Sequence, residues 1–503
     1  MNRNLGVGSW PARRAALSPR RRAYWFNECW VSYEQLHNRT TRLANALIDR
    51  GVQQGDRVAY LGHNHPAALE TLFACGIVGA TYVPIHPGFN DESIQRILAE
   101  AQPKLIVASP EFLARVSLAA GVLEHCQLVC TADAVGEWES FDSLINESSM
   151  AAIDRVIDLK ETCVLAFTSG TTGPNKGVRL SHENMLWNAM NTLTSVDYRR
   201  DDVLLSCAPL YRMGGLGFTL SMLLKGGACV IQQEAHPEGL VSLVERHGVT
   251  VLFDAVHAFT ALLNASGLER LKHSSLRLCL TGGSQVPSRL VKEYKRLGIA
   301  LQPGYGLTEA SPLALMMDPD EMDDHPTAAG RPVMFCAARV VDEHLNDVRP
   351  GELGELVLSG PNVTMGYWNS TATRAEQGWF HTGDAALIDK QGVITIVGRL
   401  SDSLILGGRR VHPGPVEEGL HAMGHASECA LIQMAPDASP DLFLVPTSDH
   451  GVDAATVMTE CQRLLGDAAV SLHIMESLPK NPNGKILRHV LQKQLDATQA
   501  PIM

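Results

Sequence analysis

The chain has 503 residues, of which 45% are hydrophobic, so it can bury a large core and is expected to hold more than one domain. Its formal net charge of -12 argues against a nucleic-acid partner, because neutralising phosphates needs a concentrated basic surface. The most apolar stretch, Ala74 to Ile85, is broken by glycines and a proline, so no membrane span is expected. The 11 cysteines are scattered without metal-ligand spacing, which favours reduced thiols and a cytoplasmic location.

The first half of the chain alternates helical and strand patterns. Thr40 to Arg50 carries apolar residues on one helical face, and Gly51 follows as a suitable C-terminal cap. Short apolar runs that are typical of buried strands occupy Arg57 to Leu61, Leu105 to Ala108, Thr162 to Phe167, Val249 to Phe253 and Leu276 to Leu280. This alternation predicts an α/β fold with largely parallel sheets.

The pattern changes after about Ala338. Closely spaced strand signals follow at Ala338 to Asp342, Glu355 to Ser359 and Val393 to Val397, separated by glycine turns. Beyond the polar, glycine-bounded segment Gly398 to Gly408, a new α+β pattern begins. We therefore expect a large N-terminal domain, residues 1–401, made of α/β subdomains and a β subdomain, hinged to a small α+β C-terminal domain, residues 402–503.

A loop rich in glycine and hydroxyl groups follows the strand that ends at Phe167. Its candidate phosphate-binding residues are Thr168, Ser169, Gly170, Thr171, Thr172 and Lys176. Backbone N–H groups and hydroxyls can surround a polyphosphate while the lysine neutralises its charge. The loop is not a Walker A motif, because Asn175 and Gly177 flank the lysine. A flexible surface turn would explain the glycines, but not the hydroxyls and the lysine directly after a buried strand.

This loop resembles the phosphate loop of the adenylate-forming superfamily, which includes acyl-CoA synthetases, adenylation domains and luciferases. The resemblance is greatest to acyl-CoA synthetases and runs from about Ala23 to Leu495, so it covers nearly the whole chain. It implies ATP, Mg²⁺ and coenzyme A as cofactors and co-substrates, with a small-molecule carboxylic acid as the substrate. It also implies that the loop holds the β and γ phosphates of ATP.

A second segment, Gln302 to Glu309, resembles the family's adenine and metal motif. The resemblance implies that Tyr305, between Gly304 and Gly306, stacks on adenine, while the following threonine, Thr308, contacts phosphate and Glu309 holds magnesium. The residue types suit these roles. A tyrosine between glycines offers an open π face, and a carboxylate supplies the hard oxygen that Mg²⁺ prefers.

Two further segments resemble nucleotide-binding motifs. Gly282, Gly283 and Ser284 resemble a strand-end loop that lets adenine and the acyl group approach the backbone, although a plain strand-to-helix turn would explain them nearly as well. Asp384 and Arg399 resemble the ribose motifs. An aspartate can accept hydrogen bonds from both ribose hydroxyls, and an arginine can add a contact.

The remaining family positions fall near and beyond the predicted domain boundary. Asp402 matches the hinge about which the family's small domain rotates between half-reactions. Gly407 and Gly408, with Arg409, are predicted to lie beside the pantetheine arm of coenzyme A. Lys485 resembles the C-terminal catalytic lysine, whose ammonium stabilises the charge that builds when a carboxylate attacks the α-phosphate. Lys480 remains an alternative to it.

Residues 208–215 resemble the acyl-pocket motif. The candidate pocket residues are Tyr211, Arg212, Met213, Gly214, Gly215, His257 and Ala314. Arg212 stands where many relatives have histidine; it could pair with an oxyanion, but a structural ion pair is preferred. His257 could line the pocket, although a core histidine is preferred. The small residues leave volume, which predicts a bulky, mainly apolar acid such as a long-chain, aryl or polycyclic carboxylate.

The resemblance therefore implies an ATP-dependent acid:CoA ligase that forms an acyl-AMP and then an acyl-CoA. Pro415 and the pair Arg409-Arg410 depart from the family pattern and bear on the thioester-forming step. One alternative is an acyl-AMP ligase or stand-alone adenylation enzyme that loads a separate carrier protein. An alternative of another class is a catalytically silent nucleotide- or acyl-binding regulator, against which the intact motif residues argue.

Overall fold

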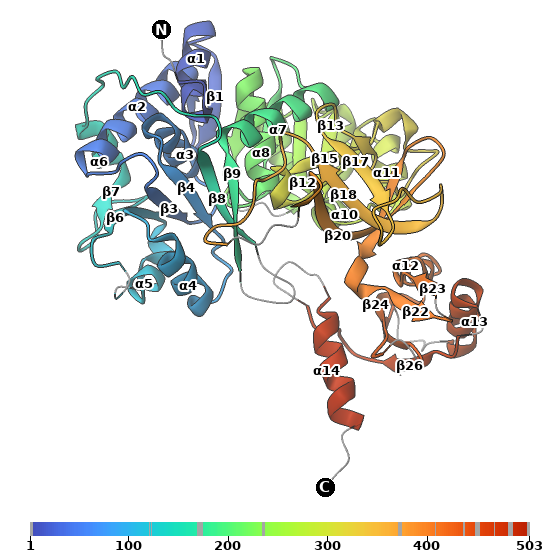
Figure 1. Ribbon diagram of the computed structural model, residues 1–503. Coiled ribbons are helices and arrows are strands. Elements are labelled where there is room, and N and C mark those ends of the chain that lie inside the picture. The colour runs from blue at the N-terminus through green and yellow to red at the C-terminus, as the bar shows by residue number, and fades with distance from the viewer. Residues whose placement is uncertain are drawn as a thin grey trace. The chain divides into compact units, whose positions relative to one another are not determined.

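The structure is a computed structural model that describes residues 4–119, 121, 123–168, 175–233, 237–370, 375–407, 409–435, 438–447, 453–466, 468–480 and 486–499. The fold is α/β, as the sequence predicts (Figure 1). The chain divides into two compact units. Unit 1 contains Met1–Ala338 and Leu358–Phe380, and unit 2 contains Arg339–Val357 and His381–Met503.

Unit 1 contains a seven-stranded sheet whose strands run in the order β7-β6-β5-β3-β4-β8-β9. Its strands are β3 (Arg57–Leu61), β4 (Thr81–Ile85), β5 (Leu105–Ala108), β6 (Gln127–Cys130), β7 (Glu139–Ser140), β8 (Thr162–Thr168) and β9 (Lys176–Ser181). The helices of this part are α2 (Tyr33–Asp49), α3 (Pro66–Val78), α4 (Asp91–Ala101), α5 (Leu113–Ser117) and α6 (Phe141–Glu147). Only the β8–β9 pair is antiparallel, so the predicted parallel character is confirmed here.

Unit 1 also contains a nine-stranded sheet in the order β16-β15-β14-β13-β12-β10-β11-β1-β2. Its strands are β1 (Arg22–Phe26), β2 (Cys29–Ser32), β10 (Val203–Ser206), β11 (Ala228–Ile231), β12 (Val251–Ala255), β13 (Leu278–Gly282), β14 (Ala300–Gly306), β15 (Leu313–Met316) and β16 (Arg331–Pro332). Its helices are α1 (Trp10–Leu17), α7 (His182–Ser195), α8 (Met213–Lys225), α9 (Pro237–His247), α10 (Val256–Leu262) and α11 (Ser288–Arg296). The central strands β10 to β14 are parallel neighbours.

Helices α3 and α8 lie in the interior of unit 1. Every residue of α3 except Ile77 is buried, and α8 is buried along nearly its whole length. A helix that is apolar on all sides must be covered on all sides. Helix α3 contacts strands β3, β4 and β8, while α8 contacts β10, β11 and β12 (Figure 1). The loops that precede these helices are therefore attached to a rigid core.

Unit 2 includes strands of a five-stranded sheet and a separate α+β part. The sheet strands are β17 (Ala337–Val341), β18 (Leu353–Ser359), β19 (Ala375–Glu376), β20 (Trp379–Ile388) and β21 (Ile394–Arg399). The later elements are β22 (Leu404–Leu406), β23 (Arg409–Val411), α12 (Gly414–Ala422), β24 (Ala426–Ile432), β25 (Asp441–Pro446), α13 (Ala454–Leu465), β26 (Ser471–Ile474) and α14 (Arg488–Gln499). Two apolar clusters of buried residues in this part contain only residues from Leu404 onward. The compact units divide first at residue 339, and a domain boundary at residue 402 stays a prediction.

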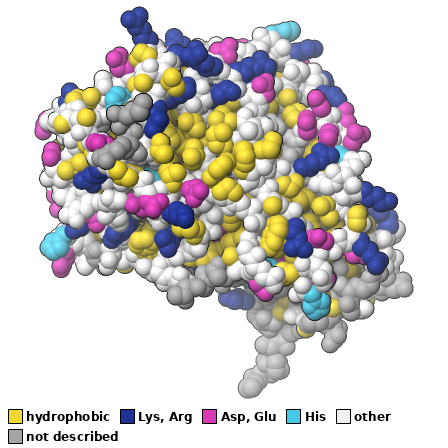
Figure 2. Space-filling view, turned by 45° about the horizontal axis from the view of Figure 1, so that its top comes forward, with side chains coloured by type: hydrophobic (Ala, Val, Ile, Leu, Met, Phe, Trp, Pro, Cys, Tyr) yellow, Lys and Arg dark blue, Asp and Glu magenta, His cyan; other side chains and the backbone are white. Residues whose placement is uncertain are grey.

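Among the described residues, no helix is both long and apolar enough to cross a membrane. On the face shown in Figure 2, basic and acidic side chains are interspersed, and apolar side chains gather near its middle.

Candidate active site

The predicted nucleotide and acyl residues of unit 1 lie along one edge of the nine-stranded sheet. Strands β10, β12, β13 and β14 are parallel neighbours, so their carboxyl ends share that edge. Residues 211–215 follow β10, His257 follows β12, residues 282–284 end β13, and residues 304–306 end β14. Open α/β sheets bind ligands outside the carboxyl ends of their strands. The topology thus brings together motifs that are up to about a hundred residues apart.

The glycines of this edge are required by close backbone packing. Gly282 pairs with Gly304 across β13 and β14, and a Cβ at Gly282 would lie 2.6 Å from the Gly304 carbonyl oxygen. A Cβ at Gly306 would lie 1.9 Å from the carbonyl oxygen of Pro312. Gly283 differs, because its φ of +87° favours glycine and its Cβ position is open. Between these glycines, Tyr305 is half-buried, whereas Ser284 is exposed.

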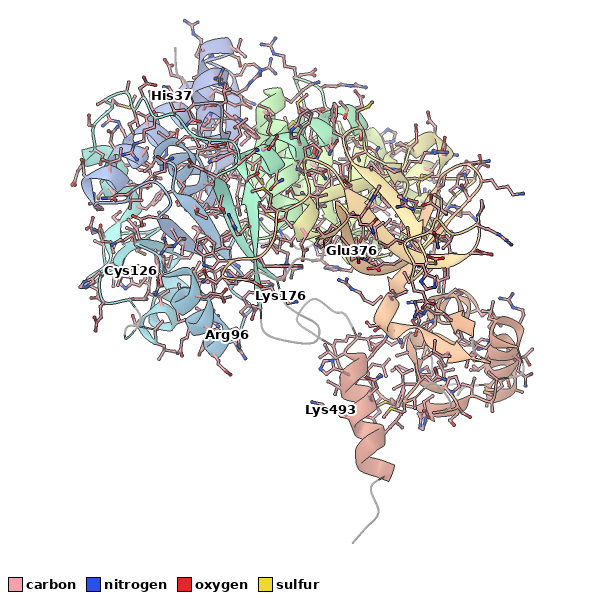
Figure 3. All side chains as sticks on the ribbon, viewed as in Figure 1. His37, Arg96, Cys126, Lys176, Glu376 and Lys493 are labelled. Atoms are coloured by element: carbon pink, nitrogen blue, oxygen red, sulfur yellow. The ribbon has the colours of Figure 1, made fainter. Side chains whose placement is uncertain are left out.

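The predicted phosphate loop lies in the chain between β8 and β9, which pair antiparallel. Thr168 pairs with Lys176 across the two strands, and its hydroxyl donates to the Lys176 carbonyl oxygen at 3.4 Å. The other predicted loop residues, Ser169, Gly170, Thr171 and Thr172, lie outside the described residues. Lys176 is exposed at the start of β9, and its Nζ lies 5.5 Å from the ring centre of Tyr367 (Figure 3).

Arg96 is a basic residue beside this loop that sequence reasoning missed. It is exposed on α4, and its Nη2 donates to Oδ1 of Asn175 at 3.0 Å. Both Arg96 and Lys176 are labelled in Figure 3. No local pattern marks Arg96, because it precedes Asn175 by 79 residues and reaches it only through the fold. It adds a second cation within reach of a loop that is predicted to hold phosphates.

Glu309 lies in a single turn of 3-10 helix, Thr308–Ala310, between β14 and β15. The Tyr367 hydroxyl donates to its Oε1 at 3.0 Å, and the Thr364 amide donates to its carbonyl oxygen at 2.7 Å. Among the described residues, no group of three or more His, Cys, Asp or Glu side chains could hold a metal alone. Mg²⁺ in nucleotide enzymes is commonly bound through one or two carboxylates plus substrate phosphates. The half-buried Glu309 carboxylate therefore fits the predicted metal.

Tyr211 and Arg212, at the start of the predicted acyl-pocket segment, pack against His86. Nη2 of Arg212 lies 2.9 Å from Nε2 of His86, and the His86 and Tyr211 ring centres are 4.6 Å apart. The Gly88 amide donates to Nδ1 of His86 at 2.8 Å. Burial raises the pKa of the Tyr211 hydroxyl. His86 follows β4 in the other sheet, so both sheets contribute to this segment, a contribution that the sequence did not reveal.

The small residues of the acyl segment have two different surroundings. A Cβ at Gly215 would lie 2.3 Å from the Pro209 carbonyl oxygen, so the fold requires glycine there. A Cβ at Gly214 would make ordinary contact with the Phe253 ring at 3.4 Å, and that ring stacks obliquely on Phe218 with centres 4.3 Å apart. A methyl group at Gly214 would therefore touch the buried Phe253 ring without overlapping it.

The three remaining predicted pocket residues, Met213, Ala314 and His257, differ in how far they are buried. Met213 is 4% exposed and Ala314 is fully buried. His257 is exposed near the start of α10. The preferred interpretation of His257 as a core histidine is therefore wrong, because the first turn of α10 leaves its side chain open to solvent.

Asn64 holds the acyl segment and was missed by sequence reasoning. It is 2% exposed in the loop after β3. Its Nδ2 donates to the Ala208 carbonyl oxygen at 3.2 Å, and its Oδ1 accepts from the Leu210 amide at 2.7 Å. A buried amide that satisfies several backbone groups fixes their positions, because breaking any of these bonds leaves a buried polar group unpaired.

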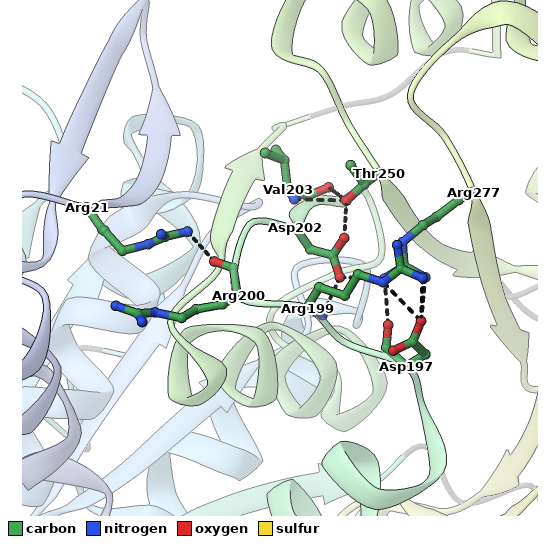
Figure 4. A network of polar contacts seen from close by, with 8 residues as sticks. All are labelled: Arg21, Asp197, Arg199, Arg200, Asp202, Val203, Thr250 and Arg277. Carbon is green, nitrogen blue, oxygen red and sulfur yellow. Dashed lines mark hydrogen bonds and ion pairs between the residues drawn. The ribbon is translucent and has the colours of Figure 1, made fainter.

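The opposite ends of the same strands carry a separate polar network (Figure 4). Asp202, which is 2% exposed, accepts from Nη2 of Arg277 at 2.6 Å and from the Thr250 hydroxyl at 2.7 Å. Asp202 directly precedes β10, Thr250 directly precedes β12, and Arg277 directly precedes β13. The network ties the amino ends of three strands together and lies away from the carboxyl edge, which favours a structural role.

In unit 2 the two predicted ribose residues are neighbours. Asp384 and Arg399 are opposite each other on β20 and β21, and Nη1 of Arg399 lies 3.2 Å from Oδ1 of Asp384. The same Nη1 donates to the Thr382 carbonyl oxygen at 3.1 Å. Asp384 is buried and the Arg399 side chain is 38% exposed. The pair therefore offers a carboxylate and a partly accessible guanidinium at one place.

The predicted hinge residue is held by a three-way arginine contact. Nε of Arg488 lies 3.4 Å from Oδ2 of Asp402, and Nη2 of Arg488 lies 2.7 Å from Oε2 of Glu417. Nη1 of Arg488 donates to the Leu431 carbonyl oxygen at 2.8 Å. Both carboxylates raise the pKa of the guanidinium against the opposing effect of its burial. Arg488 thus joins the start of α14 to Asp402.

Only part of the predicted coenzyme A segment can be placed. Gly407 is exposed, with a φ of +56° and an open Cβ position, in the turn between β22 and β23. Gly408 lies outside the described residues, as does the side chain of Arg409, whose backbone begins β23. Lys485 also lies outside the described residues.

Comparison with known proteins identifies one family and several relatives that are named as CoA ligases or synthases. A model of the AMP-binding enzyme family matches residues 11–368. The chain is 36% identical to a feruloyl-CoA synthase of Amycolatopsis sp over 98% of the chain and 99% of that protein. It is 30% identical to an indoleacetate–CoA ligase of Aromatoleum aromaticum, with 96% of each covered. The crystal structure of an anthranilate CoA ligase in complex with anthranoyl-AMP matches with a TM-score of 0.89 and 23% identity, covering 99% of each chain.

These matches confirm the resemblance seen in the sequence, together with the ATP, Mg²⁺ and coenzyme A that it implied. The fold match confirms a large N-terminal and a smaller C-terminal part. The alternative of a catalytically silent regulator is not supported, because the relatives are enzymes. The chain belongs to the AMP-binding enzyme family and is an adenylate-forming acyl-CoA synthetase.

Proposed function

We propose that the chain is an ATP-dependent ligase that joins an aryl carboxylic acid to coenzyme A through an acyl-AMP. The observation that carries the aryl assignment is the buried aromatic pair beside Gly214, formed by Phe253 of β12 and Phe218 of α8, whose ring centres lie 4.3 Å apart. Flat aromatic acids can pack edge-on or offset against such rings. Feruloyl and indoleacetyl groups, which name two relatives, are of this kind.

The first half-reaction forms the acyl-AMP. A carboxylate oxygen of the acid attacks the α-phosphorus of ATP, the bond to pyrophosphate breaks, and pyrophosphate leaves. Lys176 and the loop before it hold the β and γ phosphates, and Glu309 holds Mg²⁺, which neutralises phosphate charge when bound. Tyr305 stacks on adenine, Thr308 contacts phosphate, and Lys485 stabilises the developing negative charge.

The second half-reaction forms the thioester. The sulfur of coenzyme A attacks the carbonyl carbon of the acyl-AMP, the bond to the phosphate oxygen breaks, and AMP leaves. Asp384 and Arg399 retain the ribose in both steps. Rotation of residues 402–503 about Asp402 exchanges Lys485 for the segment at Gly407 between the two half-reactions.

Coenzyme A is the acceptor in this proposal, and the cytoplasm is the location. The relatives reported above are all named for coenzyme A as the acceptor, and none is named for a carrier protein. All 11 cysteines are free thiols, as expected for a protein in a reducing compartment.

The test is a panel of carboxylic acids with ATP and Mg²⁺, following pyrophosphate release with and without coenzyme A. Hydroxycinnamates and arylacetates are expected to give acyl-CoA with kcat/KM at least about a hundredfold above acetate, as loss of a buried aromatic contact would cause. Acetate as the best substrate contradicts the aryl assignment. Pyrophosphate release without any acyl-CoA contradicts the choice of acceptor.

A further inference from the structure

One face of α7 carries three buried asparagines. Asn184, Asn188 and Asn191 are spaced four and three residues apart, so they share a face of the helix. Their exposed fractions are 4%, 1% and 0%. Burying an amide is costly unless it is hydrogen-bonded, so a row of them has to be explained by its partners.

The partners are backbone groups of segments far along the chain. Oδ1 of Asn188 accepts from the Leu313 amide at 3.0 Å. Nδ2 of Asn184 donates to the carbonyl oxygens of Pro361 and Val363 at 2.8 and 3.0 Å. Helix α7 follows β9, which begins at Lys176, and it contacts β9 and β15. The helix therefore lies between the phosphate hairpin and the strand that follows Glu309.

A fourth buried asparagine, Asn362, joins Asn184 and Asn188 in holding these segments; we call the three residues the asparagine frame. Asn362 is fully buried, and its Nδ2 donates to the carbonyl oxygens of Ala310 and Leu313 at 3.0 and 2.9 Å. The Ser311 hydroxyl donates back to the Asn362 carbonyl oxygen at 2.8 Å. Together with Asn188, these bonds fix both ends of residues 310–313.

The segment that the asparagine frame holds also contacts Glu309. Glu309 precedes residues 310–313, and its carbonyl oxygen accepts from the amide of Thr364, two residues after Asn362. Tyr367, three residues further on, donates to Oε1 of Glu309, and its ring lies under Nζ of Lys176. Both the backbone and the side chain of Glu309 are thus tied to the segment that Asn184 and Asn362 hold.

We propose that Asn188 and Asn362 are positioning residues for magnesium binding at Glu309. The proposal rests on the role assigned to Glu309 above. Mg²⁺ demands near-ideal octahedral geometry, so a small displacement of its carboxylate ligand weakens binding. Neither asparagine contacts the reacting atoms. Each acts by holding the turn that carries the carboxylate.

The chain supplies a matched control for this proposal. Asn191 is buried on the same face of the same helix, but its Oδ1 accepts from the Phe335 amide at 2.8 Å, away from the Glu309 turn. Asn188→Ala and Asn191→Ala each remove one buried amide from α7. Only the first removes a bond to residues 310–313.

The experiment measures two properties of each variant. In ligand-free protein, hydrogen exchange followed by mass spectrometry should show faster exchange in the peptide containing Leu313 for Asn188→Ala, and in the peptide containing Phe335 for Asn191→Ala. In adenylation assays, the Mg²⁺ concentration for half-maximal pyrophosphate release should rise about tenfold for Asn188→Ala, as loss of one buried hydrogen bond would cause, and stay unchanged for Asn191→Ala. Acyl-CoA formation from supplied acyl-AMP should be unaffected in both.

Two further variants distinguish failure of the positioning proposal from failure of the magnesium role assigned to Glu309. Ser311→Ala removes only the bond to Asn362 and should shift the Mg²⁺ response in the same direction by a smaller factor, even if Asn188→Ala does not fold. Glu309→Gln should shift it most. If Glu309→Gln changes the Mg²⁺ response while Asn188→Ala and Ser311→Ala do not, the positioning proposal is overturned and the role of Glu309 stands. If Glu309→Gln has no effect, both are overturned. An equal shift in Asn191→Ala and Asn188→Ala would also overturn the proposal, because it would indicate general weakening of α7.

Discussion

The two units hold their candidate site residues in different ways. In unit 1, the segments that carry the predicted acyl and metal residues are held by buried neutral amides, such as Asn64 and Asn362. In unit 2, the corresponding contacts are charged pairs that are partly open to solvent. Arg399 contacts Asp384, and Arg488 contacts Asp402.

This difference separates a fixed part of the site from an adjustable part. Buried amide bonds are costly to break, because each leaves an unpaired polar group, and salt does not screen them. Partly exposed ion pairs contribute little and are screened by salt. The family's reaction needs one fixed platform and one set of residues that can be exchanged between half-reactions. The buried amides fit the first need, and the contact of Arg488 with Asp402 at the predicted hinge fits the second. Asp384 and Arg399, in contrast, are proposed to serve both half-reactions.

The largest effect is expected for Lys485→Ala. Adenylation should fall by at least about a hundredfold, because a charge that stabilises the transition state is lost. Thioester formation from supplied acyl-AMP should largely survive, since the residues proposed to bind the adenylate, Tyr305, Asp384 and Arg399, are unchanged. Single-turnover assays of each half-reaction measure this. Equal loss in both half-reactions would contradict the assignment of Lys485 to adenylation alone.

The next effect concerns the charged contacts of unit 2. Arg488→Lys keeps the charge but cannot serve Asp402, Glu417 and the Leu431 carbonyl together, because a lysine lacks the planar fork. Adenylation should fall about tenfold, the factor expected from loss of one charged hydrogen bond. In the wild-type enzyme, high salt should lower the adenylation rate in the same direction, because it screens these contacts; the rate is measured against ionic strength. Lys493→Met, at an exposed position of the same helix, is the control and should be neutral. A salt-independent rate would remove the distinction between the units.

A smaller effect is expected for Gly214→Ala in unit 1. The added methyl would reach contact distance from the Phe253 ring, so the KM for aryl acids should rise about threefold while the KM for ATP stays constant. Steady-state kinetics with one aryl and one short aliphatic acid measure this. An increase for the aliphatic acid alone would place the acid elsewhere.

The smallest effect is on stability and concerns the acid sensitivity of buried histidines in unit 1. His65 and His182, both in unit 1, have their pKa lowered from 6.5 to about 4 by burial. Between pH 4 and 6.5 the unfolded chain therefore binds more protons than the folded chain, so stability is full above pH 6.5 and is lost as the pH falls.

His182→Asn should reduce the slope of unfolding free energy against pH in this window by up to about 1.4 kcal/mol per pH unit. Urea unfolding between pH 4.5 and 7.5 measures it. His344→Asn, at a side chain that is 76% exposed in unit 2, should leave the slope unchanged. A wild-type slope in His182→Asn would show that this histidine is not the acid-sensitive group.

Local patterns predicted much of the fold. Strands 57–61 and 105–108 have the predicted bounds. Strands β12 and β13 begin and end two residues later than predicted, because polar and glycine residues at their carboxyl ends still pair with neighbours. Helix α2 begins at Tyr33 and not at Thr40, because Ser32 and Gln35 form a capping box. The apolar pattern marks only the part of that helix with the clearest face.

The site motifs were readable because each is a continuous segment with a distinctive composition. The residues that hold them were not. Asn64 reaches Leu210 across 146 positions, and Asn362 reaches Leu313 across 49. Single asparagines in a helix or loop give no local signal. Their importance follows from which distant backbone groups the fold presents to them.

The central claim is that this enzyme activates an aryl acid and transfers it to coenzyme A. The most direct measurement is a competition in which an equimolar mixture of a hydroxycinnamate, a long-chain fatty acid and acetate is incubated with ATP, Mg²⁺ and coenzyme A. The thioesters formed at low conversion are then identified by mass spectrometry. We expect the aryl-CoA to dominate, with one AMP and one pyrophosphate formed per thioester. A dominant long-chain acyl-CoA or acetyl-CoA, or pyrophosphate without thioester, would contradict the account.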